Sequence, residues 1–322
     1  NQEYAGGAIS GEQSQETNSA IPSRTKATFA GMFTLIGDPC HNYQTHFSDT
    51  RPDDFGFVMS AISLDLEGAD MSMQDNGYNW FSASDELSSR NANYANPYVR
   101  YVIPYTSLGI ANDIINAFPA DTKDAEAINM IAQAKTIRAF DYLSLAPYFQ
   151  GSYQTSKDKP CVPLLDGKND YTNNPRATVA EVYTAIIDDL SYAIDNLTDA
   201  REDKSRINKS VALGLRARAY LYMGEYAKAL VDAEAAMKGY TPASLADVSV
   251  PGFDDSSASN WMWTYDLTDD QVASAAASYA TAASWMSAFC GQGYAVATGN
   301  VPMINKLLYD KIPATDVRKG WW

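Results

Sequence analysis

Aromatic rings set among amides and small polar side chains are the residues of this sequence best suited to hold a ligand. They gather in two stretches, residues 74–102 and 278–296. The candidates that these stretches supply are Tyr78, Asn79, Trp80, Tyr279, Trp285 and Tyr294. A flat ring offers an apolar face to the C–H face of a sugar, and a neighbouring amide can satisfy sugar hydroxyls. We therefore interpret these residues as a candidate glycan-binding set, with ordinary burial in the core as the alternative for each ring.

Adjacent acids are a second candidate, since two carboxylates that flank a sugar bond are sufficient for its hydrolysis. The pairs are Asp53–Asp54, Asp254–Asp255 and Asp269–Asp270. In a chain with 39 acidic residues such pairs arise readily, so solvated loop charge is the favoured interpretation. The motifs GxxxxGK[ST], GxGxxG, GxSxG and HExxH are absent from the sequence. We predict that the protein is not an enzyme and assign no catalytic residue; an all-α glycoside hydrolase is kept as the third hypothesis.

Metal-binding residue types occur together once, in CHNYQTHFSD, which holds both histidines of the chain. Cys40, His41, His46 and Asp49 could surround a zinc ion. The loop has no second ligand cluster, so an ordinary polar loop is favoured and no metal site is predicted. The three cysteines form no CxxC pair, which excludes a zinc ribbon.

The net charge of the chain excludes one class of binding partner. Lys and Arg number 24 and Asp and Glu 39, a balance of −15 that repels phosphates, so no nucleic-acid partner is expected. No apolar run approaches the roughly 20 residues that span a bilayer, and the first residues do not form a signal peptide. Either the protein is cytosolic or a signal has been removed.

Helices must position these residues. Apolar periodicity predicts a helix over 125–149, and Thr178 and Glu181 at capping-box spacing begin another. Two more patterns stop at Gly224 and Gly239, forming a hairpin. The predicted apolar positions are Val179, Val182, Ile186, Leu190, Ala193, Leu197, Val211, Leu215, Ala219, Tyr222, Tyr226, Ala229, Ala233 and Met237. Helices are also predicted over 23–36, 96–118 and 279–289, with mostly loop over 37–93.

The four central helices read as two copies of one unit. IRAFDYLSL aligns with LRARAYLYM at an offset of 78, which pairs Arg138 with Arg216. YTAIIDDLSYAI aligns with YAKALVDAEAAM at an offset of 43, which pairs Asp189 with Asp232. The first unit therefore carries an insertion of 35 residues around Cys161 between its two helices. The hairpin resembles tetratricopeptide repeats.

Three motifs together resemble the SusD/RagB family, the surface lipoproteins that capture glycans for outer-membrane importers in Bacteroidetes. They are IRAFDYLSLAPYFQ followed by VPLL, then NPRATVAEVYTAIIDDLSYAIDNL, then RARAYLYMGEYAKAL. Weaker agreement extends to YTSLGIANDII and NWMWTYD, so the likeness covers most of the chain.

The resemblance implies an all-α, SusD-like fold of tetratricopeptide-like hairpins with a separate loop-rich region that binds oligosaccharide. It implies a single domain, with N-terminal helices and loops over 1–124, hairpins over 125–240 and a loop-rich part of the ligand-binding region over 241–322. The stretch YDKIPATDVRKGWW resembles one that has more chain after it in the family, so a truncation or a short variant is expected.

The function that the resemblance implies is non-catalytic binding of oligosaccharide or polysaccharide at the cell surface and delivery to a SusC-like TonB-dependent transporter. It also implies a lipidated cysteine before the present start and attachment to the outer membrane by that lipid anchor alone. Family members often carry calcium, so the resemblance allows a calcium ion to which no residue is assigned. The alternative is a tetratricopeptide-type protein-interaction scaffold without a sugar ligand.

Overall fold

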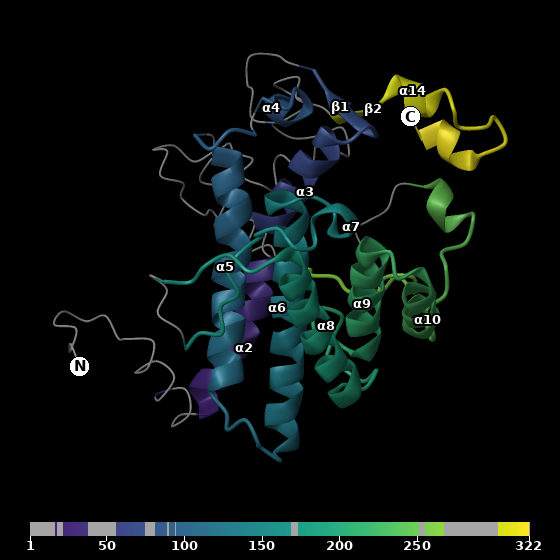
Figure 1. Cartoon of the computed structure of the whole chain (residues 1–322). Coiled ribbons are helices and arrows are strands. Elements are labelled where there is room, and N and C mark those ends of the chain that lie inside the picture. Colours follow the sequence, from purple (N-terminus) through teal and green to yellow (C-terminus); the bar gives the residue numbers. More distant parts are fainter. Residues whose placement is uncertain are drawn as a thin grey trace, which may run out of the picture. The chain divides into compact units, whose positions relative to one another are not determined.

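The computed structural model describes residues 17, 22–37, 56–74, 81–88, 90–93, 95–168, 173–250, 255–266 and 302–321 (Figure 1). The chain forms two compact units. The first comprises Asn1–Thr34, Pro104–Thr241 and Ser259–Thr264. The second comprises Leu35–Ile103, Pro242–Ala258 and Tyr265–Trp322.

Long helices dominate the described residues, as the apolar periodicity predicts. They are α2 (Pro22–Gly37), α5 (Ala95–Asn116), α6 (Ala125–Phe149), α8 (Val179–Asn196), α9 (Lys209–Met223) and α10 (Tyr226–Ala236). The helices predicted over 23–36, 96–118 and 125–149 are confirmed, each to within two residues at either end. The all-α fold class is therefore confirmed for the described residues.

Capping chemistry fixes where the central helices begin and end. Thr178 and Glu181 form the predicted capping box of α8: the Thr178 hydroxyl accepts from the Glu181 N–H at 3.2 Å, and the Thr178 N–H donates to Glu181 Oε2 at 2.7 Å. Gly224 ends α9 with φ of 79°, a left-handed conformation that side-chain-bearing residues rarely adopt. The chain turns there directly into α10.

The central helices pack in the order of the chain, α6 against α8, α8 against α9 and α9 against α10 (Figure 1). The predicted apolar stripe of α8 is buried along its whole length. In the hairpin, the buried members of the predicted stripe are Val211, Leu215, Ala219 and Ala229, and Ala233 is half-buried. The repeat thus provides the core of the first unit.

Three predicted core positions of the hairpin are wrong. Tyr222, Tyr226 and Met237 are 44%, 64% and 57% exposed. Periodicity places them on a helix face but does not say whether another helix covers that face. α10 buries only the side that meets α9.

The insertion between α6 and α8 is confirmed. It contains a one-turn helix, α7 (Tyr153–Ser156), and returns to α8 through an antiparallel bridge between Pro160 and Thr178. Cys161 within it is a buried free thiol. α6 and α9 are the first helices of the two repeat units, and α8 and α10 the second helices.

The prediction of mostly loop over 37–93 is wrong in part. α3 (Gly56–Glu67), β1 (Met71–Met73) and α4 (Ser82–Asp85) lie there, and α3 packs against both other elements. Leu66, Met73 and Phe81 are buried. Short apolar clusters between polar turns form this part of the second unit. The prediction missed them because the composition of residues 37–93 as a whole is polar.

Short elements make up the described C-terminal part. They are η2 (Asp247–Ser249), β2 (Pro302–Ile304), α14 (Lys306–Tyr309) and η4 (Val317–Trp321). The helix predicted over 279–289 lies outside the described residues. None of the described helices combines the length and the apolarity needed to cross a bilayer.

Candidate functional site

The predicted glycan-binding residues fall in two segments, residues 75–80 and 267–301. Tyr78, Asn79, Trp80, Tyr279, Trp285 and Tyr294 all lie outside the described residues. What the structure describes is the framework from which both segments extend. That framework decides whether parts of the sequence so far apart can contribute to one site.

β1 and β2 join the ends of these two segments. The strands are antiparallel, with Met73 opposite Pro302 and Met71 opposite Ile304. β1 therefore leads into residues 75–80 at the same end of the sheet at which β2 follows residues 267–301. Since a residue extends the chain by at most about 3.6 Å, Tyr78 lies within about 18 Å of Met73. Two segments separated by almost 200 residues thus share one point of attachment.

Side-chain hydrogen bonds hold the framework on both sides of residues 75–80. The Met73 N–H donates to Asp85 Oδ2 at 3.3 Å, which ties β1 to α4. Asn96 Nδ2 donates to Ser84 Oγ at 3.3 Å, which ties α4 to the start of α5. Asn96 and Ser84 are both buried. The residues on both sides of the segment with Trp80 are therefore held in a packed structure.

Some rings of the same stretch belong to the core. Phe81 directly follows Trp80 and is 2% exposed. Tyr98 packs against the buried pair Val99 and Ile103. Phe81 is buried and Tyr98 is half-buried, so the aromatic composition of residues 74–102 overstates the number of fully available rings.

The tryptophans of NWMWTYD, Trp261 and Trp263, are half-buried. Trp263 Nε1 donates to the Ser205 carbonyl at 3.0 Å. Its ring meets Phe140 of α6 edge-on, with the centroids 5.4 Å apart. Trp263 therefore packs within the first unit, to which residues 259–264 belong.

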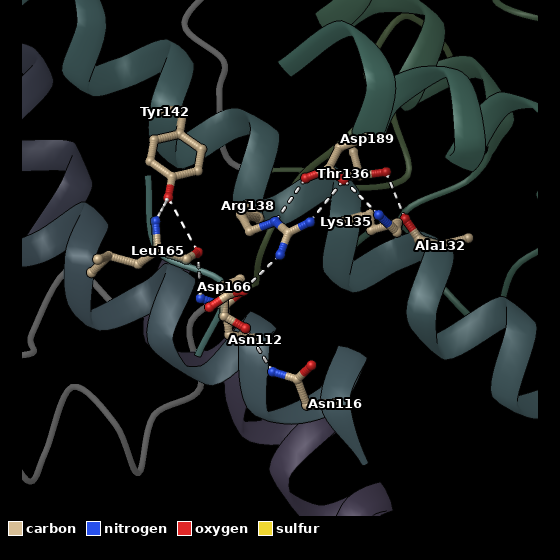
Figure 2. Close-up of polar contacts among 10 residues, drawn as sticks. All are labelled: Asn112, Asn116, Ala132, Lys135, Thr136, Arg138, Tyr142, Leu165, Asp166 and Asp189. Atoms are coloured by element: carbon tan, nitrogen blue, oxygen red, sulfur yellow. Dashed lines mark hydrogen bonds and ion pairs between the residues drawn. The ribbon is translucent and has the colours of Figure 1, made fainter. Parts of the chain in front are cut away.

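A polar network lies inside the first unit (Figure 2). Arg138 of α6 donates to both carboxylate oxygens of Asp189 on α8, from Nε at 2.7 Å and from Nη2 at 2.9 Å. Lys135 Nζ lies 2.7 Å from Asp189 Oδ1. Arg138 Nη1 donates to Asn112 Oδ1 on α5 at 2.7 Å. Asp189 and these cations are largely buried, and the one carboxylate pairs with both of them.

The same network holds the insertion by its backbone. Asn112 Nδ2 donates to the Leu165 carbonyl at 2.9 Å, and Asn116 Nδ2 donates to the Asp166 carbonyl at 2.7 Å (Figure 2). The Tyr142 hydroxyl accepts from the Leu165 N–H at 2.7 Å and lies 3.3 Å from its carbonyl. Side chains of α5 and α6 thus satisfy the polar groups of a segment without regular structure.

Electrostatics assign this network a structural role. Burial raises the pKa of Tyr142 to about 12, so its hydroxyl stays neutral near pH 7. Burial also acts against the charge of Arg138, but the hydrogen bonds and the charge of Asp189 outweigh it and raise the pKa of the guanidinium. Arg138 and Tyr142 therefore keep one protonation state and the same hydrogen-bond partners. This favours a structural role for them over a role in proton transfer.

Asp141 of α6 is the acid that sequence reasoning missed. Its side chain is fully buried, and its oxygens make no hydrogen bond of ordinary geometry among the described residues. Burial raises the pKa of this carboxyl well above its usual range, and the nearby hydroxyl of Ser107 opposes the shift only in part. Its position in the apolar period of α6 is the signal that could have identified it.

The acid pairs and the loop CHNYQTHFSD lie almost entirely outside the described residues. Among the acid pairs only Asp255 is described, and it accepts from the Ser257 N–H at 2.8 Å. The four candidate metal ligands lie outside the described residues. Within the part of the chain that is described, no three His, Cys, Asp or Glu side chains cluster so as to hold a metal ion.

The repeat units and the insertion fall in the part of the chain that matches a known family. Residues 57–221, just over half of the chain, match the SusD-like family model described as starch-binding associating with outer membrane. The chain belongs to the SusD-like family. A SusD-like protein of Bacteroides ovatus is 30% identical over 123 residues, which are 36% of this chain and 21% of that protein. The family description names starch binding and association with the outer membrane.

Solved SusD-like structures share the fold. A SusD-like carbohydrate binding protein from Bacteroides vulgatus superposes with a TM-score of 0.75 at 20% identity, covering 92% of this chain and 60% of that one. A SusD superfamily protein from Bacteroides thetaiotaomicron has a TM-score of 0.69 at 21% identity, covering 92% and 63%. A laminarin binding SusD-like protein has a TM-score of 0.52 at 18% identity, covering 69% and 45%. The chain thus spans less than two thirds of the length of these relatives.

Proposed function

We propose that this SusD-like protein binds oligosaccharide or polysaccharide without chemically changing it. The residues proposed to contact sugar are Tyr78, Asn79, Trp80, Tyr279, Trp285 and Tyr294. The observation that carries the proposal is the pairing of Met73 with Pro302, which gives both ring-bearing segments one attachment point on a packed framework. Loops held by a rigid scaffold are the usual place for ligand contacts.

Affinity electrophoresis tests this site. Purified protein is run in native gels that contain a glycan. The panel includes starch, which the family description names, and laminarin, which the name of a structurally similar protein contains. Trp80→Ala and Trp285→Ala should each abolish the retardation of the wild type. Loss of one central ring should reduce the binding free energy by about 2 kcal/mol, which raises Kd roughly 30-fold.

Trp321→Ala is the matched control. Trp321 is 49% exposed and belongs to neither ring-bearing segment, so this variant should migrate as the wild type does. Unchanged retardation of Trp80→Ala and Trp285→Ala would refute the site. Failure of every glycan in the panel to retard the wild type would refute glycan binding itself.

Delivery to a SusC-like TonB-dependent transporter and attachment through a lipidated cysteine are the finer parts of the proposal. The family description, which places the family at the outer membrane, supports both. Expression of the full open reading frame in a Bacteroidetes host tests them together. The protein should partition with detergent, resist extraction by salt and co-purify with a TonB-dependent transporter. Partition into the aqueous phase would contradict the anchor, and purification without a transporter would contradict the partnership.

A protein-interaction scaffold is the second candidate, favoured by the exposed apolar side chains of α9 and α10. Isothermal titration against the same glycans separates the two functions. Glycan binding that Trp80→Ala removes supports the first. Stable association with a protein partner, with no heat from any glycan, supports the scaffold.

A further inference from the structure

α4 is followed by a turn whose backbone conformation leucine rarely adopts. Leu87, two residues beyond the last residue of this helix, has a φ of 58°. In this left-handed region the Cβ of an L residue crowds the following backbone carbonyl. The other described residues with positive φ are all glycines, Gly167, Gly224 and Gly239. Backbone geometry therefore favours glycine at position 87, where the chain has leucine.

Hydrogen bonds on both sides of Leu87 hold this conformation. The Leu87 N–H donates to the Ser84 carbonyl at 3.0 Å, and the Ser84 hydroxyl accepts from Asn96 Nδ2 at 3.3 Å. After the turn, Arg90 Nε donates to Glu67 Oε2 on α3 at 3.2 Å. Strained backbone persists only where the surrounding structure determines it, and it clusters at ligand-binding and other functional sites.

The Leu87 side chain does not offset this strain by packing in the core. It is 45% exposed, whereas Phe81 at the start of the same turn is 2% exposed and Leu66 of α3 is 1% exposed. Burial of apolar surface is what lets a leucine stabilise a fold, and Leu87 leaves nearly half of its surface in solvent. A contact that this side chain makes with a ligand would account for leucine at this position.

Leu87 lies within reach of the segment that carries Trp80. The Ser84 N–H donates to the Phe81 carbonyl at 2.9 Å and the Leu87 N–H to the Ser84 carbonyl, so residues 81–87 form a continuous helical turn. From the rise of such a turn and one further peptide unit, the Leu87 Cα lies within about 15 Å of the Trp80 Cα. One oligosaccharide can therefore contact both side chains.

We propose that Leu87 is a further sugar-contact residue, which packs its isobutyl group on the C–H face of a sugar unit beside the one that Trp80 holds. The inference rests on the proposed glycan site and extends it to a residue without a ring or a polar side-chain atom. Ligand sites are lined mainly by apolar side chains. A sulfate or carboxylate against Leu87 would lose hydration without gaining a partner, so the ligand class is neutral oligosaccharide.

Substitution of Leu87 separates contact with sugar from support of the fold. Leu87→Asn suits positive φ and removes the apolar side chain. In isothermal titration with starch or laminarin, whichever retards the wild type in gels, this variant should raise Kd about fivefold. Its melting temperature should rise by about 2 °C because backbone strain is relieved. A residue that only supported the fold would lower the melting temperature, so the two opposite effects identify a ligand contact.

Two variants serve as controls. Leu87→Met keeps both the strain and an apolar side chain, so its Kd and melting temperature should match those of the wild type. Leu245 is 63% exposed and has no positive φ, so Leu245→Asn should change neither quantity. Against a sulfated form of the same glycan, Leu87→Asn should narrow the preference of the wild type for the neutral form.

The outcomes distinguish this inference from the proposed function. An unchanged Kd for Leu87→Asn, in a protein whose wild type binds glycan, would refute the contact and leave the proposed function in place. Weaker binding together with a lower melting temperature would assign Leu87 to the fold. Loss of a co-purifying transporter at unchanged Kd would assign it to a protein partner. If no glycan binds the wild type, the proposed function and the contact are both refuted.

Discussion

Arg216 donates to both carboxylate oxygens of Asp232, from Nε at 2.7 Å and from Nη2 at 2.9 Å, using the same atoms at the same distances as Arg138 with Asp189. Each pair joins the first helix of a repeat unit to the second. Bidentate pairing of this kind fixes orientation as well as distance. The alignment of the two units at offsets of 78 and 43 residues is therefore matched by equivalent contacts.

The two ion pairs are expected to differ in their contribution to stability. Asp189→Asn leaves two cations, Arg138 and Lys135, without their carboxylate, whereas Asp232→Asn leaves only Arg216. We expect Asp189→Asn to lower the free energy of unfolding by about 3 kcal/mol, because breaking a buried pair strands its charge. Asp232→Asn should cost less. Urea unfolding followed by circular dichroism measures both, with the exposed acid Asp188→Asn as the control. Equal losses for the two variants would contradict the network.

The buried carboxyl of Asp141 predicts a pH dependence of stability. Its pKa in the folded state is raised from 3.8 by burial, so the folded state holds the proton while the unfolded state loses it. Stability from this group is therefore complete below about pH 4 and is lost as pH rises toward the folded-state pKa. Asp141→Asn should be more stable than the wild type at pH 7, and the difference should shrink at pH 4. A difference that is constant from pH 4 to pH 7 in thermal melts would contradict the raised pKa.

Gly167 is expected to tolerate a side chain less well than Gly239. Both have positive φ, 75° and 87°, so alanine costs about 1–2 kcal/mol of backbone strain at either position. A Cβ at Gly167 would also lie 2.9 Å from Asn116 Nδ2 and 3.0 Å from Asn112 Cβ, whereas nothing lies within 4 Å at Gly239. Gly167→Ala should therefore lower the melting temperature more and speed amide exchange over residues 163–168. Equal melting temperatures for the two variants would contradict this prediction and show that the backbone around residue 167 shifts to make room for the methyl group.

Incubation with glycans should release no reducing ends. Binding energy alone does not accelerate hydrolysis, which needs a positioned acid and base. The assay uses the glycans that retard the protein in gels, with a known glycosidase as the positive control. Release that disappears in Asp269→Asn or Asp53→Asn would contradict the non-catalytic proposal and favour the glycoside hydrolase hypothesis.

Much of the fold could be predicted because its signals are local. The capping box at Thr178, the buried stripe of α8 and the boundary at Gly224 each depend on residues within a few turns of helix. The small elements α3 and β1 could not be predicted in the same way. They are held by packing between segments whose own composition is polar and loop-like.

For the candidate site, the sequence could predict which types of residue take part but not how they are arranged. The sequence identifies rings among amides, but it does not reveal that Phe81 is buried or that Tyr98 packs against the core. The meeting of β1 with β2 is likewise invisible in the sequence, because strand pairing between segments so far apart depends on the whole chain between them.

By itself, the sequence determined the helical repeat, its insertion and the family motifs, because periodicity, capping and alignment are properties of neighbouring residues. Only the tertiary structure decided which faces of those helices are covered. Tyr183 and Tyr226 occupy equivalent positions in two copies of one unit, yet the first is 3% exposed and the second 64%. A helix packs over the first and none of the described helices packs over the second, and burial depends on that neighbour.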